Sequence, residues 1–267
     1  MMLKTIIALF FLVVSGGFEA DKAAGRNAGE IRSGQNASTP AEQQEGPDTA
    51  TSARLDPVHF SNLKWRSIGP AIRSGRISDI AVVESDPDII YVGTAGGGAF
   101  KSVDGGITWD PVFEKEGSSA IGGIAVAQSN PNVVWIATGE PNGRNLVSTS
   151  WGDGVYKSED AGNSWTHMGL RGCQQMGRIA IHANDPQTVF VSCIGSLWDT
   201  AEDNESRGLY RTIDGGGTWQ KVLSAGSRAG VVEVVINPDD PDLLYAGAWQ
   251  RERRDWSWLS TGPESGV

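Results

Sequence analysis

Three nonapeptides in the chain combine residue types that could hold a phosphate or a metal ion. They are KSVDGGITW at 101–109, KSEDAGNSW at 157–165 and RTIDGGGTW at 211–219. A calcium loop would need more oxygen ligands than one aspartate per turn supplies. A Walker-type phosphate loop would need a Gly-Lys-Ser/Thr ending and a following helix, which these sequences lack. We therefore predict tight hairpins, in which the aspartate accepts hydrogen bonds from turn N–H groups, glycine supplies positive φ and the tryptophan anchors the outer strand in a buried core.

Arginine and carboxylate side chains form a second candidate site. When the repeated units of the chain are aligned, Asp79, Gly123, Arg178 and Glu233 take equivalent positions at the start of the innermost strand. Arginine binds carboxylates bidentately and is concentrated here, whereas lysine favours the side of the nonapeptides. We therefore predict a ligand-binding face. Its candidate residues are Arg76, Asp79, Glu140, Asn142, Arg144, Arg178, Glu233, Arg251 and Arg254.

Each part of this face also has a purely structural interpretation. Two arginines could simply pair with carboxylates of neighbouring units, Arg76 and Arg178 with Asp79 and Glu233. The run RERRDWSW at 251–258 could be a solvated loop or a contact between units. Four polar residues could cap their own loop rather than clamp a ligand: Glu140, Asn142, Arg144 and Asn145. Four tryptophans could stack on sugar rings or on apolar side chains: Trp151, Trp198, Trp256 and Trp258.

The same carboxylates raise the alternative of a glycoside hydrolase acting on an extracellular polysaccharide. Most glycosidases need two carboxyls about 5–5.5 Å or about 6.5–9.5 Å apart, and the face offers several: Asp79, Glu140, Asp153 and Glu233. The sequence alone does not select a pair. The chain has three histidines, no Ser-His-Asp pattern and no metal-ligand spacing, so neither a metal nor a cofactor is predicted. We favour a binding or scaffold domain for a peptide, protein or glycan.

A repeat must position these residues. The tryptophans that end the nonapeptides, Trp109, Trp165 and Trp219, are 56 and 54 residues apart. An Asp/Asn-Pro step recurs at intervals of 44, 55 and 55 residues, at Pro87, Pro131, Pro186 and Pro241. Each unit has the pattern of four short antiparallel strands, with the nonapeptide between the third and the fourth. Four strands in about 40 to 55 residues are typical of a β-propeller blade, so we predict an all-β chain of about three and a half blades.

The nonapeptides resemble the Asp-box, or BNR, repeat of sialidases, sortilin-type propellers and xyloglucanases. The residues that match its pattern are Ser102, Asp104, Gly106, Thr108, Trp109, Ser158, Asp160, Gly162, Ser164, Trp165, Thr212, Asp214, Gly216, Thr218 and Trp219. More narrowly, SIGPAIRSGRISDIAV, TGEPNGRN and GDGVYKSEDAGNSW resemble large exported bacterial proteins labelled sortilin-like or glycosyl hydrolase, over about Leu63 to Val267. The resemblance implies a structural turn remote from the ligand face. The sialidase Arg-Ile-Pro motif has only IRSGRI as its nearest match, which argues against sialidase activity.

The N-terminal segment predicts export to a secreted or periplasmic location. Residues 1–20 hold one lysine before an apolar run from Ile6 to Val14, which is typical of a secretory signal; a retained membrane anchor is the alternative. Residues 21–58 lack periodicity and predict a disordered linker, which leaves 59–267 for the propeller. No membrane span is expected beyond the signal.

Cysteine content and net charge bear on the redox state of the protein and on its partners. In an oxidising compartment Cys173 and Cys193 could pair, or they could be two small buried side chains. The net charge of −10 argues against nucleic acid as a partner, because phosphate binding needs a basic face.

The ends of the repeat predict that further blades complete the propeller. LKWRSIGP at 63–70 aligns with the outer-strand segments, with Trp65 matching the nonapeptide tryptophans, and TGPESGV at 261–267 stops where the other units lead into a nonapeptide. We therefore expect missing C-terminal blades of the same chain as an intramolecular partner. On their own, these 267 residues should aggregate or stay partly unfolded, because sheet edges and apolar faces would be exposed.

Overall fold

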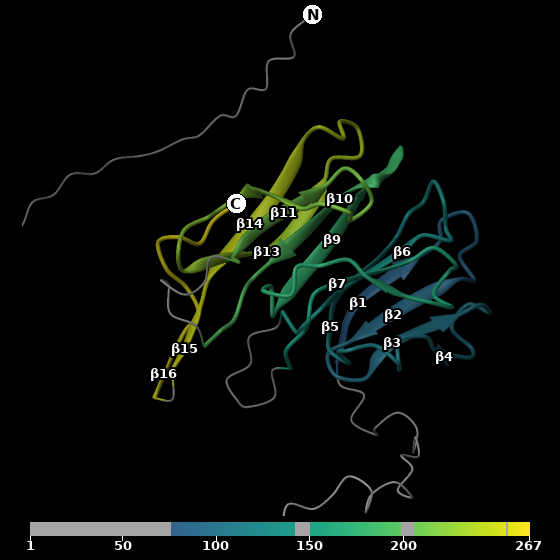
Figure 1. The fold of residues 1–267 in the computed structure, drawn as a ribbon, viewed down its shortest axis with the longest axis horizontal. Helices are drawn as coiled ribbons and strands as arrows, with labels where there is room; N and C mark the ends of the chain where they lie inside the picture. Colours follow the sequence, from purple (N-terminus) through teal and green to yellow (C-terminus); the bar gives the residue numbers. More distant parts are fainter. Residues whose placement is uncertain (1–75, 142–149, 199–205, 255) are drawn as a thin grey trace, which may run out of the picture. The chain divides into compact units, whose positions relative to one another are not determined.

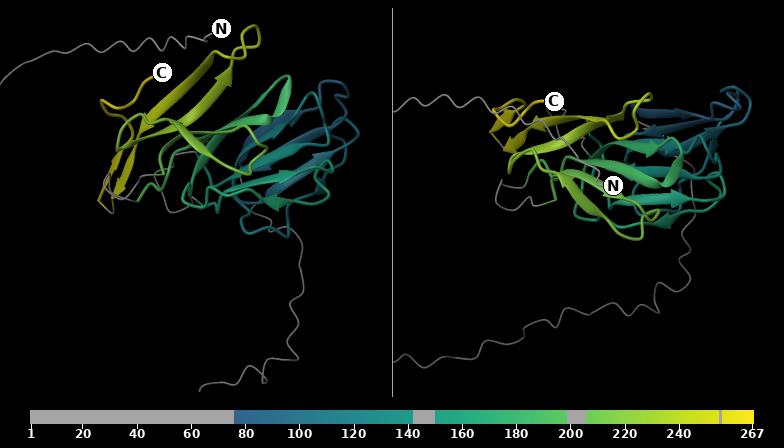
Figure 2. Two further views of the ribbon diagram at one scale, coloured as in Figure 1. Left: turned by 45° about the horizontal axis from the view of Figure 1, so that its top comes forward. Right: turned by 90° about the horizontal axis from the view of Figure 1, so that it is seen from above.

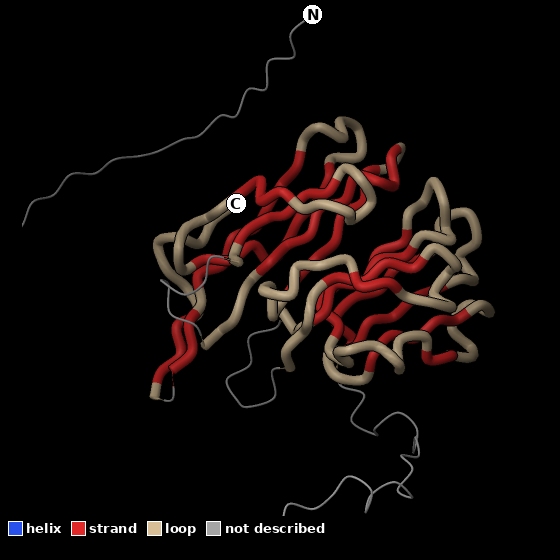
Figure 3. Tube along the Cα trace, viewed as in Figure 1, coloured by secondary structure: helices blue, strands red, loops and turns tan. Residues whose placement is uncertain are grey.

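The computed structural model describes residues 76–141, 150–198, 206–254 and 256–267, all within the compact unit Trp65–Val267. Every regular element in these ranges is a β-strand (Figure 3). No helix in them is long and apolar enough to cross a membrane. The predicted signal, the linker and the segment 63–70 fall outside the described residues.

Three four-stranded antiparallel sheets follow one another along the chain (Figure 1). The first contains β1 (Ile77–Val82), β2 (Ile90–Thr94), β3 (Gly98–Ser102) and β4 (Asp110–Pro111). The second contains β5 (Ile121–Val126), β6 (Val134–Thr138), β7 (Val155–Ser158) and β8 (Thr166–His167). The third contains β9 (Met176–His182), β10 (Asp185–Cys193), β11 (Gly208–Thr212) and β12 (Gln220–Leu223). In each sheet the strands pair in sequence order, which confirms the four-stranded unit predicted from the repeat.

A fourth unit contributes the paired strands β13 (Ala229–Ile236) and β14 (Leu244–Gln250). A backbone bridge between Ala248 and Gly266 places the last residues beside β14. The other units have their third strand in this position, so the fourth unit follows the same plan over the part that the structure describes.

The run 251–258 forms strands over most of its described residues rather than a solvated loop. It contributes β15 (Glu252–Arg254) and the start of β16 (Ser257–Leu259), which pair as an antiparallel hairpin. The hairpin contacts the third unit, because the Arg253 N–H donates to the Leu197 carbonyl at 3.0 Å and its guanidinium lies 4.9 Å from the Trp198 ring. Of the two alternatives for this run, the contact between units is the one observed.

The first strands of the four units, β1, β5, β9 and β13, lie next to one another in that order (Figure 2). Their backbones approach so closely that only glycine fits at some contacts. A Cβ on Gly122 would collide with the Met176 carbonyl oxygen, and a Cβ on Gly177 with the Val232 carbonyl oxygen. These glycines set the spacing of neighbouring units at their inner strands.

Apolar cores fill the space between successive sheets. The first and second sheets bury Tyr91, Phe113, Ile121 and Ile136; the second and third bury Trp135, Met176 and Val191; and the third and fourth bury Phe190, Val231 and Val234. Each such side chain contributes about 1.5–3 kcal/mol by leaving water. The sheets therefore pack face to face, each one stabilising the next.

Each nonapeptide is the hairpin predicted between the third and fourth strands. The carboxylate of Asp104 accepts hydrogen bonds from the Thr108 hydroxyl (2.6 Å), the Thr108 N–H (2.9 Å) and the Ser102 hydroxyl (2.8 Å). Asp160 and Asp214 make the equivalent bonds in the other two units. These bonds from the following threonine or serine lower the pKa of all three aspartates to about 2.

The tryptophans that end the nonapeptides join one unit to the next, with one exception. The indole N–H of Trp165 donates to the Val112 carbonyl, and that of Trp219 to the Met168 carbonyl, each at 2.7 Å and each in the preceding unit. The prediction that Trp109 is a buried anchor is wrong for the described part of the chain. Trp109 is 40% exposed, and its indole N–H donates to the Gly106 carbonyl of its own turn at 3.0 Å.

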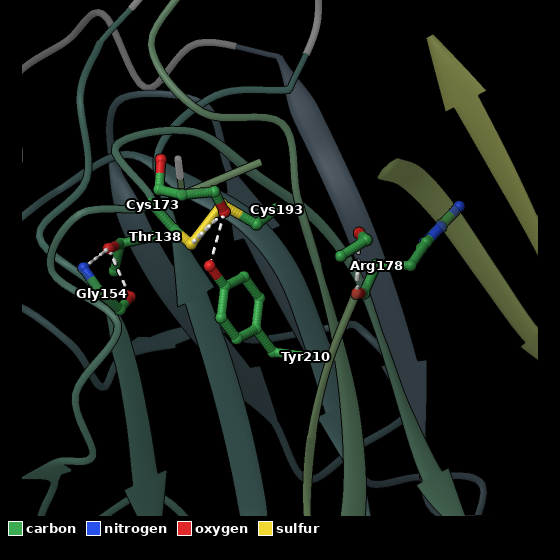
Figure 4. The surroundings of a disulfide bond; sticks show 8 residues. Thr138, Gly154, Cys173, Arg178, Cys193 and Tyr210 are labelled. Carbon is green, nitrogen blue, oxygen red and sulfur yellow. Dashed lines mark hydrogen bonds between the residues drawn. A yellow bond between two sulfur atoms is a disulfide. The ribbon is translucent and has the colours of Figure 1, made fainter. Parts of the chain in front are cut away.

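Cys173 and Cys193 form a disulfide, with Cα atoms 5.5 Å apart (Figure 4). The bond ties the segment before β9 to the end of β10, inside the core between the second and third sheets. Beside it the Tyr210 hydroxyl donates to the Ser206 carbonyl at 2.9 Å. A cross-link between residues 20 positions apart stabilises the fold by about 3 kcal/mol.

Candidate functional site

A β-bulge at the same place in every innermost strand positions the candidate residues. The register shifts between Ile77 and Asp79 in β1, between Ile121 and Gly123 in β5 and between Val231 and Glu233 in β13. In the third unit the shift spans Met176 to Ile179, the stretch that contains Arg178. The equivalence of Asp79, Gly123, Arg178 and Glu233 that the sequence suggests therefore holds. A bulge re-aims the side chain that follows it, and here it does so in four neighbouring strands.

Arg178 connects three of the four units. Its guanidinium forms an ion pair with Asp79 in the first unit, and its Nε lies 3.3 Å from a carboxylate oxygen of Glu233 in the fourth. Gly123, the equivalent residue of the second unit, has no side chain, and a Cβ there would collide with the Gly177 carbonyl oxygen. The other oxygen of Asp79 accepts the Ile124 N–H at 3.0 Å. The structural alternative considered for Arg178 is thus observed.

A groove of about 510 Å³ runs along the inner strands β1, β5 and β9 beside this ion pair. Asp79 and Arg178 line one part of it, and Glu84, Gln128 and His182 line another. The side chain of Arg178 is 44% exposed and that of Glu233 48%, while Asp79 is buried. A guanidinium that is only partly covered by its two carboxylates can still bind a further anion.

A second polar cluster lies where the loops leave the sheets. Glu140, two residues beyond β6, is buried and forms an ion pair with Arg76, so Arg76 has a different carboxylate partner from the one the sequence suggests. The next residue, Pro141, presents its carbonyl to the guanidinium of Arg251. The second nitrogen of that guanidinium donates to the side-chain oxygen of Gln175 at 3.0 Å. Four side chains of this cluster, those of Arg76, Glu140, Gln175 and Arg251, come from four different units.

Arg251 is the most enclosed cation among the described residues. Its side chain is 1% exposed and its guanidinium lies 4.9 Å from the ring of Trp249. Arg207, itself buried, donates to the carbonyls of Arg228 and Ser196. Burial, and then the like charge of Arg207, lower the pKa of Arg251 to about 9. The guanidinium stays charged at neutral pH, but at an energetic cost.

The remaining candidate residues are not gathered with these two clusters. Arg254 pairs with Glu252 at 3.5 Å, and Arg228 approaches the same carboxylate at 3.6 Å. Asn142 and Arg144 fall outside the described residues. Asp153 accepts the Tyr156 hydroxyl at 2.7 Å and lies 3.5 Å from Arg171. Its role in the described structure is to fix the loop that precedes β7.

Lysine side chains occupy the opposite end of the sheets, as the sequence suggests. Lys101, Lys157 and Lys221 each place their ammonium 5.4–5.7 Å from an aromatic ring, those of Tyr91, Trp135 and Tyr210. These cations stabilise the packing of the sheets next to the nonapeptides. The arginines at the loop ends are thus chemically separate from the lysines.

Gln175 and Arg207 belong to the buried cluster and were not among the predicted site residues. Gln175 directly precedes β9 and Arg207 directly precedes β11. A long polar side chain at the boundary of a predicted strand, on the side where the loops open, is the signal that could have found them. Within the described ranges no group of three or more His, Cys, Asp or Glu side chains is arranged to hold a metal ion.

No family model matches the chain, and no curated protein matches it. Among solved structures, it is similar to an ancestral GH74 enzyme at 21% identity and a TM-score of 0.50, over 68% of this chain and 23% of that one. The chain has a β-propeller fold. YCF48 bound to D1 peptide aligns at 17% identity and a TM-score of 0.44, over 72% of this propeller chain and 56% of that chain. The β-propeller domain of Cps50 (Swd1) from Myceliophteria thermophila aligns at 11% and 0.43, over 66% and 50%.

The propeller chain spans about a quarter of the length of the GH74 enzyme and about half of the other two proteins. At these identities the likeness concerns the fold. The candidate site must therefore be argued from its own residues.

Proposed function

We propose that this chain is part of an exported β-propeller that binds an anionic peptide, protein or glycan at the loop ends of its sheets. The observation that carries the proposal is the gathering of guanidinium groups there, led by Arg178, whose side chain is 44% exposed at the edge of a groove. Guanidinium is suited to bidentate recognition of carboxylates. Loops that vary in length on a rigid scaffold are the usual place for such recognition.

The state of the carboxylates favours binding over hydrolysis. A glycosidase needs one carboxyl that holds a proton and a second that is ionised. Asp79 and Glu140 are each paired with an arginine, and a neighbouring guanidinium stabilises the ionised form of a carboxyl. These two residues are therefore poor general acids, although the resemblance of the nonapeptides to the Asp box keeps a glycoside hydrolase as the competing hypothesis.

Export is part of the proposal. The apolar N-terminal run supports it, and so does the disulfide between Cys173 and Cys193, because such bonds persist in oxidising compartments. An exported propeller would meet peptides and polysaccharides outside the cytoplasm.

The test is a screen of the full-length protein. Immobilised protein is probed with acidic and neutral peptides and with uronate-containing and neutral oligosaccharides, and the soluble protein is incubated with chromogenic glycosides. We expect retention of acidic probes, weaker retention at higher salt and no glycoside turnover. Sustained turnover of any glycoside would replace the binding hypothesis with a hydrolase.

A further inference from the structure

Arg251 carries a buried charge that no described carboxylate matches. Its two terminal nitrogens contact neutral groups, the Pro141 carbonyl and the side-chain oxygen of Gln175. No aspartate or glutamate of the described residues lies within ion-pair distance of it, although its side chain is only 1% exposed. Buried charges in proteins are normally paired, because an unpaired one loses hydration without compensation.

The surroundings of Arg251 add positive charge. Arg207 is close enough to disfavour the charged form of Arg251. Glu252, the next residue along the chain, lies near Arg228 and Arg254, and Glu140, which precedes the Pro141 that Arg251 contacts, is engaged by Arg76. The backbone of Gly139 lies against Gln174 and Gln175, so Glu140 and Gln175 come from segments in direct contact. The described charged members of the cluster are therefore three guanidinium groups, those of Arg76, Arg207 and Arg251, and one carboxylate, that of Glu140.

Two N–H donors of this cluster also lack an acceptor within the described part of the chain. They are Nε of Arg251 and the amide nitrogen of Gln175, and both side chains are at least 99% buried. A buried donor without an acceptor costs stability, so natural structures almost always supply one. A negatively charged acceptor would accept these hydrogen bonds and also compensate the charge of Arg251. A water molecule would only accept the hydrogen bonds.

We infer that Arg251 and Gln175 form a subsite for a single carboxylate group of the bound ligand. The inference rests on the proposed binding function and names the chemistry that this function recognises. One carboxylate oxygen accepts from Nε of Arg251 and the other from the amide of Gln175. Both side chains are buried in the structure, so a carboxylate can reach them only after a rearrangement, and association is slower than diffusion.

Gln175→Glu is the decisive variant, because it places a carboxylate beside Arg251 with almost no change in shape. We expect it to raise the melting temperature of the full-length protein and to abolish binding of a carboxylate probe. Gln187→Glu, the same change at an exposed position of β10 away from the groove, is the matched control and should leave acetate binding unchanged.

Acetate is the probe and acetamide its neutral counterpart, both titrated at constant ionic strength. Labelling with 5-fluorotryptophan gives a signal at Trp249, which stacks on Arg251 and is assigned by its loss in Trp249→Phe. In the parent protein acetate should shift this resonance saturably and acetamide should not. N-acetylglycine and glucuronate then show whether a peptide or a sugar carboxylate fits the subsite better.

Two results would overturn the inference. One is an acetate titration without a saturable shift at Trp249. The other is a Gln175→Glu protein that melts lower than the parent or binds acetate within twofold of it. If acidic probes still bound the protein in an Arg178-dependent way, the proposed function would stand while this subsite would not.

Discussion

Asp104, Asp160 and Asp214 show how a charged residue can serve the fold alone. Each accepts hydrogen bonds from its own turn, and these bonds lower its pKa from 3.8 to about 2. The ionised form is therefore the one that the folded turn stabilises. Each aspartate adds stability above pH 4, and this contribution fades as the pH falls from about 4 towards 2.

Asp160→Asn is expected to flatten the acid limb of the stability profile. The amide cannot accept all the bonds that Asp160 accepts from Ser158 and Ser164, and it does not titrate. Urea midpoints measured between pH 2 and pH 6 should show a lower midpoint at pH 6 and a smaller fall below pH 4. Asp86→Asn, at an exposed position in the turn between β1 and β2, is the control. An acid limb of unchanged steepness in Asp160→Asn would contradict the assignment.

At the scale of elements, the second and third sheets are each held to the preceding sheet by an indole. Trp165 bonds Val112 and packs edge-on against Phe113, with ring centroids 5.3 Å apart. Trp219 bonds Met168 and packs against Trp135 in the same way, at 6.1 Å. In these two units the aspartate of the nonapeptide stabilises the hairpin, and the tryptophan joins the unit to the preceding one.

Trp165→Phe should be more destabilising than Trp109→Phe. The first change removes a hydrogen bond between units and leaves the Val112 carbonyl without its donor, at about 1–3 kcal/mol. The second affects a ring that is 40% exposed and bonded within its own turn. Chemical denaturation of the two variants, side by side, measures the difference. Equal losses would mean that Trp109 is as buried as the sequence repeat implies.

Sequence reasoning recovered the strands because the repeat supplied their spacing three times over. Asp79, Gly123, Arg178 and Glu233 came into register because the Asp/Asn-Pro steps, which recur after 44, 55 and 55 residues, align the units. Sequence reasoning did not find that Arg251 is buried or that Gln175 contacts it, because those contacts depend on how loops from different units meet. The hairpin of β15 and β16 was missed for a related reason, since a charged run gives little strand signal.

At the scale of the whole molecule, the two ends of the sheets carry different chemistry. Lysines and aspartates at the nonapeptide end are used for packing and turns. Arginines at the loop end form partly exposed ion pairs around a groove, and one of them is buried without a described carboxylate. A propeller with this division would bind anionic ligands at one end only.

The most direct test compares two arginines at opposite ends of the sheets. Affinity of the full-length protein for an oligoglutamate peptide is measured from low to high salt in the parent, in Arg178→Lys and in Arg211→Lys. Lysine keeps the charge beside Asp79, so the fold should survive, but it loses the bidentate geometry. Arg211 begins the third nonapeptide, donates to the Gln220 side chain and is the matched control. We predict binding that weakens with salt, at least fivefold weaker in Arg178→Lys and unchanged in Arg211→Lys. Equal affinity in all three proteins would contradict the arginine-rich loop end as the binding site.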